Sequence, residues 1–176
     1  MIALGVDPPN GWAVVDGDRR ISSGQWSKRI TDAKLAMNVV EAVDLARSLG
    51  ARVMGIEGQF WEWRDSVEKK KRAGLIRSAL VLSSRSGMWK QEWLRQSGGM
   101  PLVVLPPSDW RRSVLGRGAP RSSAAVNAYV IQMMSLIYRR DLRGAELRED
   151  EANAVGIARC VSVDPRWVGV LRIGTR

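Results

Sequence analysis

The order of its short apolar runs constrains the fold of this chain more than any other feature of the sequence. Three runs lie at residues 2–6, 11–15 and 20–26. Only four residues separate each run from the next, and these contain the turn sequences DPPN and DGD. Connections this short join antiparallel neighbours, because a parallel connection needs about a dozen residues or more. The first 26 residues therefore predict a three-stranded antiparallel meander.

After the meander, apolar strands alternate with helices. Residues 33–49 place apolar side chains at helical spacing, with Asp32 as the predicted N-cap and Gly50 as the stop. Compact apolar runs predict two further strands, and helical patterns predict three further helices. The strands are expected at residues 51–58 and 101–107, and the helices at residues 65–96, 122–140 and 149–160. This order predicts an α/β fold with a mixed sheet, in a single domain spanning residues 1–176.

The chain carries a strong excess of basic residues. Lysine and arginine total 28 against 18 aspartate and glutamate residues, which gives a formal net charge of +10. Such an excess favours a polyanionic partner such as nucleic acid. The alternative is a basic, solvated surface, because composition alone does not show that the charges form a site that recognises nucleic acid.

Missing residue types restrict the chemistry. A single cysteine, Cys160, excludes an intramolecular disulfide and a cysteine-cluster zinc site, and the absence of histidine removes the commonest general base. Any catalysis must then rest on carboxylates, hydroxyls, lysines or bound metal. No apolar run reaches the length of about 18 residues that spans a bilayer, and no cleavable leader is recognisable. We therefore expect no membrane association and a cytoplasmic location.

Two acidic residues follow directly on predicted strands. Asp7 ends the first strand before a proline turn, and Glu57 ends the fourth. If these strands are parallel neighbours, both carboxylates emerge at the same edge of the sheet. Carboxylates gathered in this way repel one another, and a divalent cation between them relieves the repulsion. The alternative is that each acid separately caps a turn or a helix.

A third acidic group opens the last predicted helix, in the stretch REDEANAVGIARC at residues 148–160. Asp150 and Asn153 are three residues apart and share one face of that helix. The small residues Ala152, Ala154 and Gly156 are expected to let the helix approach the sheet closely. The alternative is a charged helix start, in which the acids only favour the positive end of the helix dipole.

Taken together, these segments resemble the RuvC-type Holliday junction resolvases of the RNase H-like nuclease superfamily. IALGVDPPNGWAVVD is similar to the family's opening strand, acidic residue and turn, and VMGIEGQF to its strand-end Glu followed by an aromatic residue. SDWRRSVLGRGAPRSSA resembles the basic segment before a helix, and DEANAVGIA the acidic helix DExDAxxIA. The four motifs stand in the family's order and cover nearly the whole chain.

The resemblance implies a five-stranded RNase H-like sheet flanked by helices on both faces, and a nuclease that nicks opposed strands of four-way DNA junctions. In such a site, Asp7 is the central metal-bridging carboxylate and Glu57 and Asp150 are further ligands. Asn153 stands where the family places its last catalytic acid, usually Asp. The expected cofactor is Mg²⁺, two ions per active site, with Mn²⁺ as a substitute.

The resemblance also implies DNA-binding residues and a homodimer. Phe60, with Trp61 beside it, matches an aromatic that wedges into the junction; packing under the loop is the alternative, and the more expected one for Trp63. The helix at residues 65–96 carries more apolar surface than one sheet face needs, and its family counterpart makes the dimer contact. Basic residues that bracket GRG are expected to contact phosphates, at Arg111, Arg112, Arg117 and Arg121.

Asn153 leaves three explanations open. The asparagine traps an inactive state, or Glu149 or Glu151 replaces the missing acid, or the chain has lost cleavage and only binds junctions. A different RNase H-like nuclease, acting on RNA or on hybrids, is the alternative enzyme. A small-molecule enzyme has little support, because no Gly-rich phosphate-binding fingerprint joins a strand to a helix.

Overall fold

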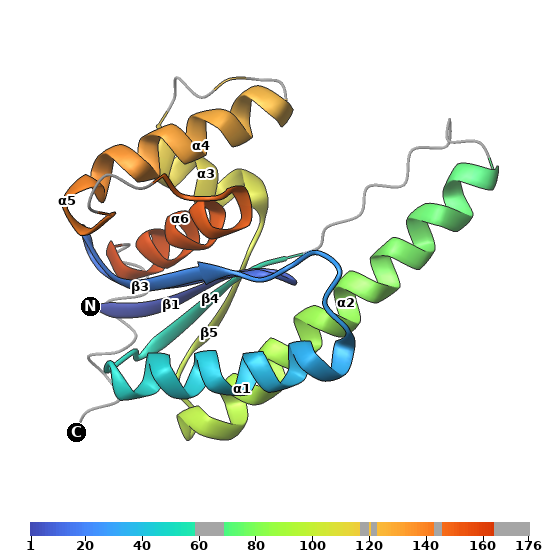
Figure 1. The fold of residues 1–176 in the computed structure, drawn as a ribbon, viewed down its shortest axis with the longest axis horizontal. Coiled ribbons are helices and arrows are strands. Elements are labelled where there is room, and N and C mark those ends of the chain that lie inside the picture. Colours follow the sequence, from blue (N-terminus) through green and yellow to red (C-terminus); the bar gives the residue numbers. More distant parts are fainter. Residues whose placement is uncertain (59–68, 117–119, 121–122, 143–145, 164–176) are drawn as a thin grey trace.

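A five-stranded mixed sheet forms the centre of the fold (Figure 1). The computed structural model describes residues 1–58, 69–116, 120, 123–142 and 146–163. The strands are β1 (Ile2–Asp7), β2 (Gly11–Asp16), β3 (Arg19–Gln25), β4 (Val53–Glu57) and β5 (Leu102–Leu105), in the order β3-β2-β1-β4-β5. The first three pair antiparallel, so the predicted meander is confirmed, and β4 pairs in parallel with both β1 and β5.

Helices cover both faces of the sheet, as expected (Figure 1). One face is covered by α1 (Asp32–Ser48) and α2 (Lys69–Ser97). The other is covered by α3 (Pro107–Leu115), α4 (Ser123–Ile137) and α6 (Glu149–Val163), with the short α5 (Arg139–Leu142) following α4. None of the helices in the described part of the chain is long and apolar enough to span a membrane.

Alternate side chains of β1 contribute to two hydrophobic cores, one on each face of the sheet. Leu4 and Val6 pack towards α1 and α2, in a cluster that includes the fully buried Trp89 and Trp93. Ala3 faces the opposite side and packs in the cluster of α3, α4 and α6. Because successive side chains of a strand point to opposite faces, a run with no polar residue is expected for a strand covered on both sides.

The close contact between α6 and the sheet depends on glycines in the strands. A Cβ placed on Gly5 would overlap the carbonyl oxygen of Ala154 and crowd the amide nitrogen of Ala158, and one on Gly11 would overlap the carbonyl oxygen of Asp150. The expectation that Gly156 serves this approach is wrong, because its Cα faces the ring of Trp110, with a Cβ there 2.8 Å from the indole.

Substituting Gly5 by alanine should therefore lower the free energy of unfolding by about 3 kcal/mol, since the added methyl group forces the α6 backbone away from β1. Gly87→Ala is the matched control, because a Cβ at Gly87 in α2 meets open space. It should leave stability unchanged or raise it by up to about 1 kcal/mol through helix propensity. Urea denaturation measures both changes, and equal effects would contradict the close approach.

Three local predictions need correction. The N-cap of α1 is Thr31, whose hydroxyl accepts a hydrogen bond from the Lys34 amide at 3.3 Å, so Asp32 is the first helical residue. The strand predicted at residues 101–107 ends at Leu105, and α3 follows it with Pro107 at its start. Proline is well suited to the first turn of a helix, where its missing N–H leaves no bond unmade. The helix predicted at residues 122–140 is divided between α4 and α5.

Candidate functional site

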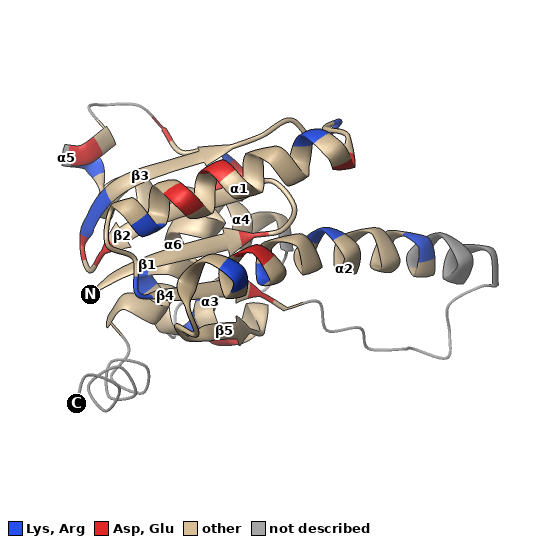
Figure 2. Ribbon diagram, turned by 90° about the horizontal axis from the view of Figure 1, so that it is seen from below, with Lys and Arg blue, Asp and Glu red and all other residues tan. Residues whose placement is uncertain are grey.

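Asp7 and Glu57 lie at the same edge of the sheet. They end β1 and β4, which are parallel neighbours with Val6 opposite Ile56. The two carboxylates therefore leave adjacent strand ends in the same direction, as the sequence predicted. Figure 2, in which acidic residues are red, shows the arrangement of the strands with α6 and α3 beside them.

The start of α6 brings Asn153 to Asp7. The Asn153 side-chain amide donates a hydrogen bond from Nδ2 to Oδ2 of Asp7 at 2.9 Å. Asn153 is 6% exposed, so this contact is made in a largely dehydrated environment. Because Asn153 and Asp7 are 146 positions apart, the contact depends on the packing of α6 on β1 and β2.

Asp150 is held by two neutral side chains from the meander. Asn10, in the turn between β1 and β2, lies near the Asp150 carboxylate and lowers its pKa, and Oε1 of Gln25 accepts a hydrogen bond from the Asp150 backbone amide at 3.2 Å. Asn10 is 3% exposed, and its backbone carbonyl oxygen accepts a hydrogen bond from the Trp26 backbone amide. The turn is therefore fixed where it meets α6.

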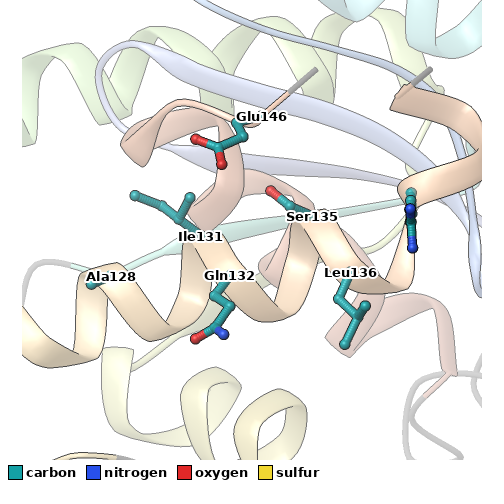
Figure 3. A pocket seen from close by; sticks show the side chains of 7 residues that line it. Ala128, Ile131, Gln132, Ser135, Leu136 and Glu146 are labelled. Carbon is teal, nitrogen blue, oxygen red and sulfur yellow. The ribbon is translucent and has the colours of Figure 1, made fainter. Parts of the chain in front are cut away.

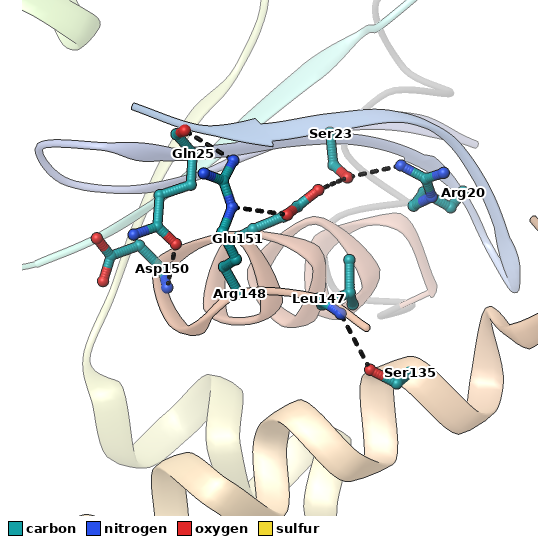
Figure 4. Close-up of polar contacts among 8 residues, drawn as sticks. All are labelled: Arg20, Ser23, Gln25, Ser135, Leu147, Arg148, Asp150 and Glu151. Carbon is teal, nitrogen blue, oxygen red and sulfur yellow. Dashed lines mark hydrogen bonds and ion pairs between the residues drawn. The ribbon is translucent and has the colours of Figure 1, made fainter. Parts of the chain in front are cut away.

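A polar clasp between β3 and α6 fixes the helix start (Figure 4). Arg148 donates to the Gln25 carbonyl oxygen at 2.8 Å and forms an ion pair with Glu151 at 3.8 Å. Ser23 donates to the other oxygen of Glu151 and accepts from Arg20 at 2.8 Å. These contacts align the first turn of α6 with the sheet, and with it Asp150.

Glu149 and Glu151 have partners of their own. Glu149 accepts a hydrogen bond from the Asn127 side chain at 2.7 Å, and Glu151 is engaged by Ser23 and Arg148. Neither carboxylate is paired with Asp7, whose contact from α6 is Asn153. The geometry therefore favours Asn153 itself as the α6 residue at the centre of the site.

The electrostatics of Asp7 show accumulated negative charge. Burial raises the pKa of Asp7 well above its usual range, and the nearby Glu57 and Asp150 carboxylates raise it further. The hydrogen bond from Asn153 acts in the opposite direction, because a donor stabilises the ionised form. A neutral amide at this position therefore offsets part of the repulsion that a carboxylate would increase.

The other two carboxyl groups show the same direction of change. Burial raises the pKa of Glu57, opposed by a hydrogen bond from Trp110 and by the charge of Arg111. Burial also raises the pKa of Asp150, opposed first by Lys28. Three carboxyl groups that all resist ionisation form an environment in which a cation is favoured.

Ligand chemistry at the site suits a hard divalent cation. Two buried amide oxygens, Oδ1 of Asn153 and Oδ1 of Asn10, have no hydrogen-bond partner among the residues that the structure describes. A buried carbonyl oxygen without a partner is costly, and such oxygens, with carboxylates, are the ligands that Mg²⁺ and Mn²⁺ prefer. The residues present therefore fit the ion that the sequence implied.

The carboxylates are nevertheless not gathered around one point. Among the residues that the structure describes, no three acidic, histidine or cysteine side chains lie close enough together to hold one ion. Asp7 is in contact with Asn153, whereas Glu57 is in contact with Trp110. The metal centre and its ligands therefore remain a prediction, for which the arrangement of Asp7, Glu57, Asp150 and Asn153 is the basis.

Of the predicted DNA-binding residues, two can be placed. Arg111 lies with its guanidinium carbon 5.3 Å from the centroid of the Trp110 ring, and its buried Nε has no hydrogen-bond partner in the described part of the chain. Arg112 is exposed on the same helix, α3. The remaining predicted residues lie outside the described part of the chain: Phe60, Trp61, Trp63, Arg117 and Arg121.

Sequence reasoning missed two residues that contact the carboxylates, Asn10 and Trp110. Asn10 stands in the quoted turn DPPN, but nothing in its spacing indicates a contact with Asp150, which is 140 positions away. For Trp110 a local signal existed. The segment PSDWRRSVL has proline at its start, Asp109 in its first turn and apolar residues at positions 110 and 114, a pattern typical of a short helix.

A separate pocket of about 650 Å³ lies along α4 (Figure 3). None of the four predicted metal ligands lines it. Its lining residues are Ala128, Ile131, Gln132, Ser135, Leu136, Arg139 and Glu146. With one carboxylate and one guanidinium among mostly uncharged side chains, it does not provide the oxygen ligands that the strand ends provide.

Comparison with known proteins identifies the fold. The RuvC structure of Thermus thermophilus matches with a TM-score of 0.58 and 16% identity, over 99% of this chain and 98% of that chain. T. thermophilus RuvC in complex with a Holliday junction substrate matches with a TM-score of 0.61 and 17% identity, over 96% of each chain. No protein-family model matches the chain, and no curated protein sequence matches it. The chain therefore has a RuvC-type, RNase H-like fold.

Proposed function

We propose that this chain is a metal-dependent endonuclease that cuts four-way DNA junctions. The observation that carries the proposal is the meeting of Asp7 with Asn153, beside Glu57 and Asp150, at the ends of the parallel strands β1 and β4. The RuvC-type fold supports it, as does the similarity to a RuvC structure that holds a Holliday junction substrate. The net charge of +10 favours a polyanionic substrate.

The four residues of the site have different roles in this proposal. Asp7 is the central ligand, because it ends β1 between β4 and α6, and because the carboxylates of both Glu57 and Asp150 raise its pKa. Glu57 and Asp150 are ligands on either side, and Asn153 contributes its carbonyl oxygen. A divalent ion, when bound, supplies activation of water and stabilisation of the charge on the leaving oxygen. Two Mg²⁺ ions per site remain the expectation from the family resemblance.

Basic side chains near the carboxylates hold the DNA backbone. Arg111 is suited to a phosphate near Glu57, because its guanidinium is held over the Trp110 ring beside that carboxylate and can donate to phosphate oxygens in a fork geometry. Arg112 adds charge on the exposed side of α3. Arg117 and Arg121 as phosphate ligands, and Phe60 with Trp61 as a junction wedge, complete the proposed interface.

The exposed side of α2 supports a homodimer. Ile76, Leu80 and Leu94 are 43%, 66% and 54% exposed. The spacings of four and fourteen residues put all three on one helix face, which can pack against the same face of a second copy. Trp89 and Trp93, on the same helix, are fully buried in the core and are not part of this exposed face.

A Leu80→Glu variant should therefore be monomeric where the parent chain is dimeric, because a buried unpaired charge at the centre of the apolar face opposes association. Size-exclusion chromatography with light scattering measures the mass. Val81→Glu is the matched control, since Val81 is 45% exposed on another side of α2 and should remain dimeric. A monomeric parent, or equal dissociation of both variants, would remove the proposed interface.

The proposed activity is tested on labelled substrates of equal length: a four-way junction, a linear duplex and an RNA–DNA hybrid. Mg²⁺-dependent cleavage at opposed strands of the junction, with no cleavage of the duplex, is the expected result. Cleavage of the hybrid alone would favour the alternative RNase H-like nuclease, which the same carboxylates suit. Tight junction binding without cleavage under any divalent ion would select a binding protein instead.

A further inference from the structure

The indole of Trp110 holds the carboxylate of Glu57. Its Nε1–H donates a hydrogen bond to Oε2 of Glu57 at 2.7 Å. Trp110 is fully buried, so this donor has no competition from bulk water. A hydrogen bond to a charged acceptor in such surroundings is stronger than one between neutral groups.

The position of the indole is determined by three neighbours. α3 begins two residues after β5, so Trp110 lies beside the end of β4, where Glu57 is. Gly156 of α6 provides room for the ring, because a Cβ there would lie 2.8 Å from it. The guanidinium of Arg111 lies over the ring, with its carbon 5.3 Å from the centroid. A flat, rigid side chain packed in this way offers its single N–H in one direction only.

Two other buried tryptophans use their N–H groups differently. Trp89 donates to the carbonyl oxygen of Pro9 at 3.4 Å, and Trp93 to those of Met100 and Pro101 at 3.2 and 3.1 Å. Those acceptors belong to the backbone, so the bonds satisfy the indoles and tie loops to α2. The bond of Trp110 is instead made to an ionisable side chain at the proposed active site, over a distance that is shorter by about 0.4 Å or more.

We infer that Trp110 is a positioning residue that orients Glu57 for a divalent ion, an inference that rests on the proposed function. Glutamate has three rotatable side-chain bonds, and a carboxylate repelled by Asp7 would otherwise rotate away from the sheet edge. With Oε2 engaged by the indole, Oε1 is the oxygen left for the ion. Partners of this kind, which contact a ligand and not the metal, commonly change metal affinity by about 10- to 100-fold.

The inference is tested by Mn²⁺ binding to the DNA-free protein in isothermal titration calorimetry. Trp110→Phe keeps most of the ring and removes the N–H, and should weaken Mn²⁺ binding by about 10- to 100-fold. Trp93→Phe removes the same group from an equally buried indole at the far end of α2, and should change the affinity less than about twofold. Trp110→Phe in a Glu57→Gln background should cause no further loss, because Trp110 acts through the carboxylate.

A measurement that leaves Trp110 in place covers the case in which the Phe variant does not fold. In ¹H–¹⁵N spectra of the intact protein, the Trp110 indole N–H signal should move on addition of Mg²⁺ and in Glu57→Gln, while that of Trp93 should stay. Three results would overturn the inference about Trp110 without affecting the proposed metal site. They are a normal Mn²⁺ affinity in Trp110→Phe, an equal loss of affinity from Trp110→Phe in the parent and Glu57→Gln backgrounds, and an indole signal unaffected by Mg²⁺. A parent chain that binds no Mn²⁺ would overturn the proposed metal site together with it.

Discussion

Asp7→Asn should abolish junction cleavage while leaving the fold and junction binding intact. The substitution changes one atom and removes one charge, and Oδ1 of the new amide can still accept the hydrogen bond from Asn153. We expect cleavage to fall by more than about 100-fold, because residues that only contact a metal ligand already contribute about 10- to 100-fold. Gel-shift titration in Ca²⁺ should give the same junction affinity as the parent chain within about threefold.

The stability of the same variant distinguishes a metal ligand from a structural acid. Burial and Glu57 raise the pKa of Asp7, so the folded protein keeps a proton that the unfolded chain has already lost as the pH rises above about 4. Ionising Asp7 therefore opposes folding, and stability falls as the pH rises through the folded pKa. An asparagine at position 7 does not ionise, so the Asp7→Asn variant avoids this loss of stability. In EDTA at neutral pH the variant should unfold at the same temperature as the parent chain or at a higher one.

Asp44→Asn provides the matched control for both measurements. Asp44 is exposed on α1, on the face turned away from the sheet, so its replacement should change neither cleavage nor the melting temperature. A cleavage-competent Asp7→Asn variant would contradict the placement of the site. So would a variant that melts well below the parent chain, because Asp7 would then serve the fold.

The residues that could be predicted are those whose places follow from local patterns. Asp7 and Glu57 were found because each ends an apolar run, and strand ends are visible in sequence as the change from apolar to turn residues. The pair Asp150 and Asn153 was found from its spacing of three on a helix. What joined the two groups was the resemblance to a family, since no local pattern states that β4 lies beside β1 or that α6 crosses both.

The contacts that support these residues could not be predicted in the same way. Asn10 and Trp110 act through partners 140 and 53 positions away, and such contacts depend on how whole elements pack. The helix that carries Trp110 has a recognisable start in the sequence, because a proline after a strand can begin a helix as well as end the strand. The glycines of β1 and β2 show another limit: alternation predicts which residues share a face, but not which face meets α6 at backbone distance.

Asn153 affects the charge balance of the proposed metal site. The Asn153 side-chain amide donates a hydrogen bond to the Asp7 carboxylate at 2.9 Å. A carboxylate at position 153 would instead bring a second negative charge to about this distance from Asp7. Two carboxylates in contact cannot both ionise without a counter-ion, and one of them keeps its proton. In the proposed site, an aspartate at position 153 would need a cation to balance its charge, whereas the asparagine donates a hydrogen bond to Asp7 and lowers the charge of the site by one.

Asn153→Asp should accordingly have opposite effects in the absence and presence of Mg²⁺. In EDTA at neutral pH the variant should lose about 2 kcal/mol of stability, because one of two buried carboxyl groups in contact must keep a proton that it would lose in the unfolded chain. With Mg²⁺ bound, the added carboxylate becomes a ligand, so Mg²⁺ affinity should rise about tenfold or more and cleavage at limiting Mg²⁺ should rise with it.

Asn153→Ala separates the two causes of these changes. It removes the donor without adding a charge, so it should lose stability in EDTA like the Asp variant but gain no affinity for Mg²⁺. Thermal unfolding with and without Mg²⁺, together with junction cleavage across a Mg²⁺ series, measures all three proteins. If Asn153→Asp binds Mg²⁺ no better than the parent chain, and cuts no faster at any Mg²⁺ concentration, position 153 does not belong to the metal site.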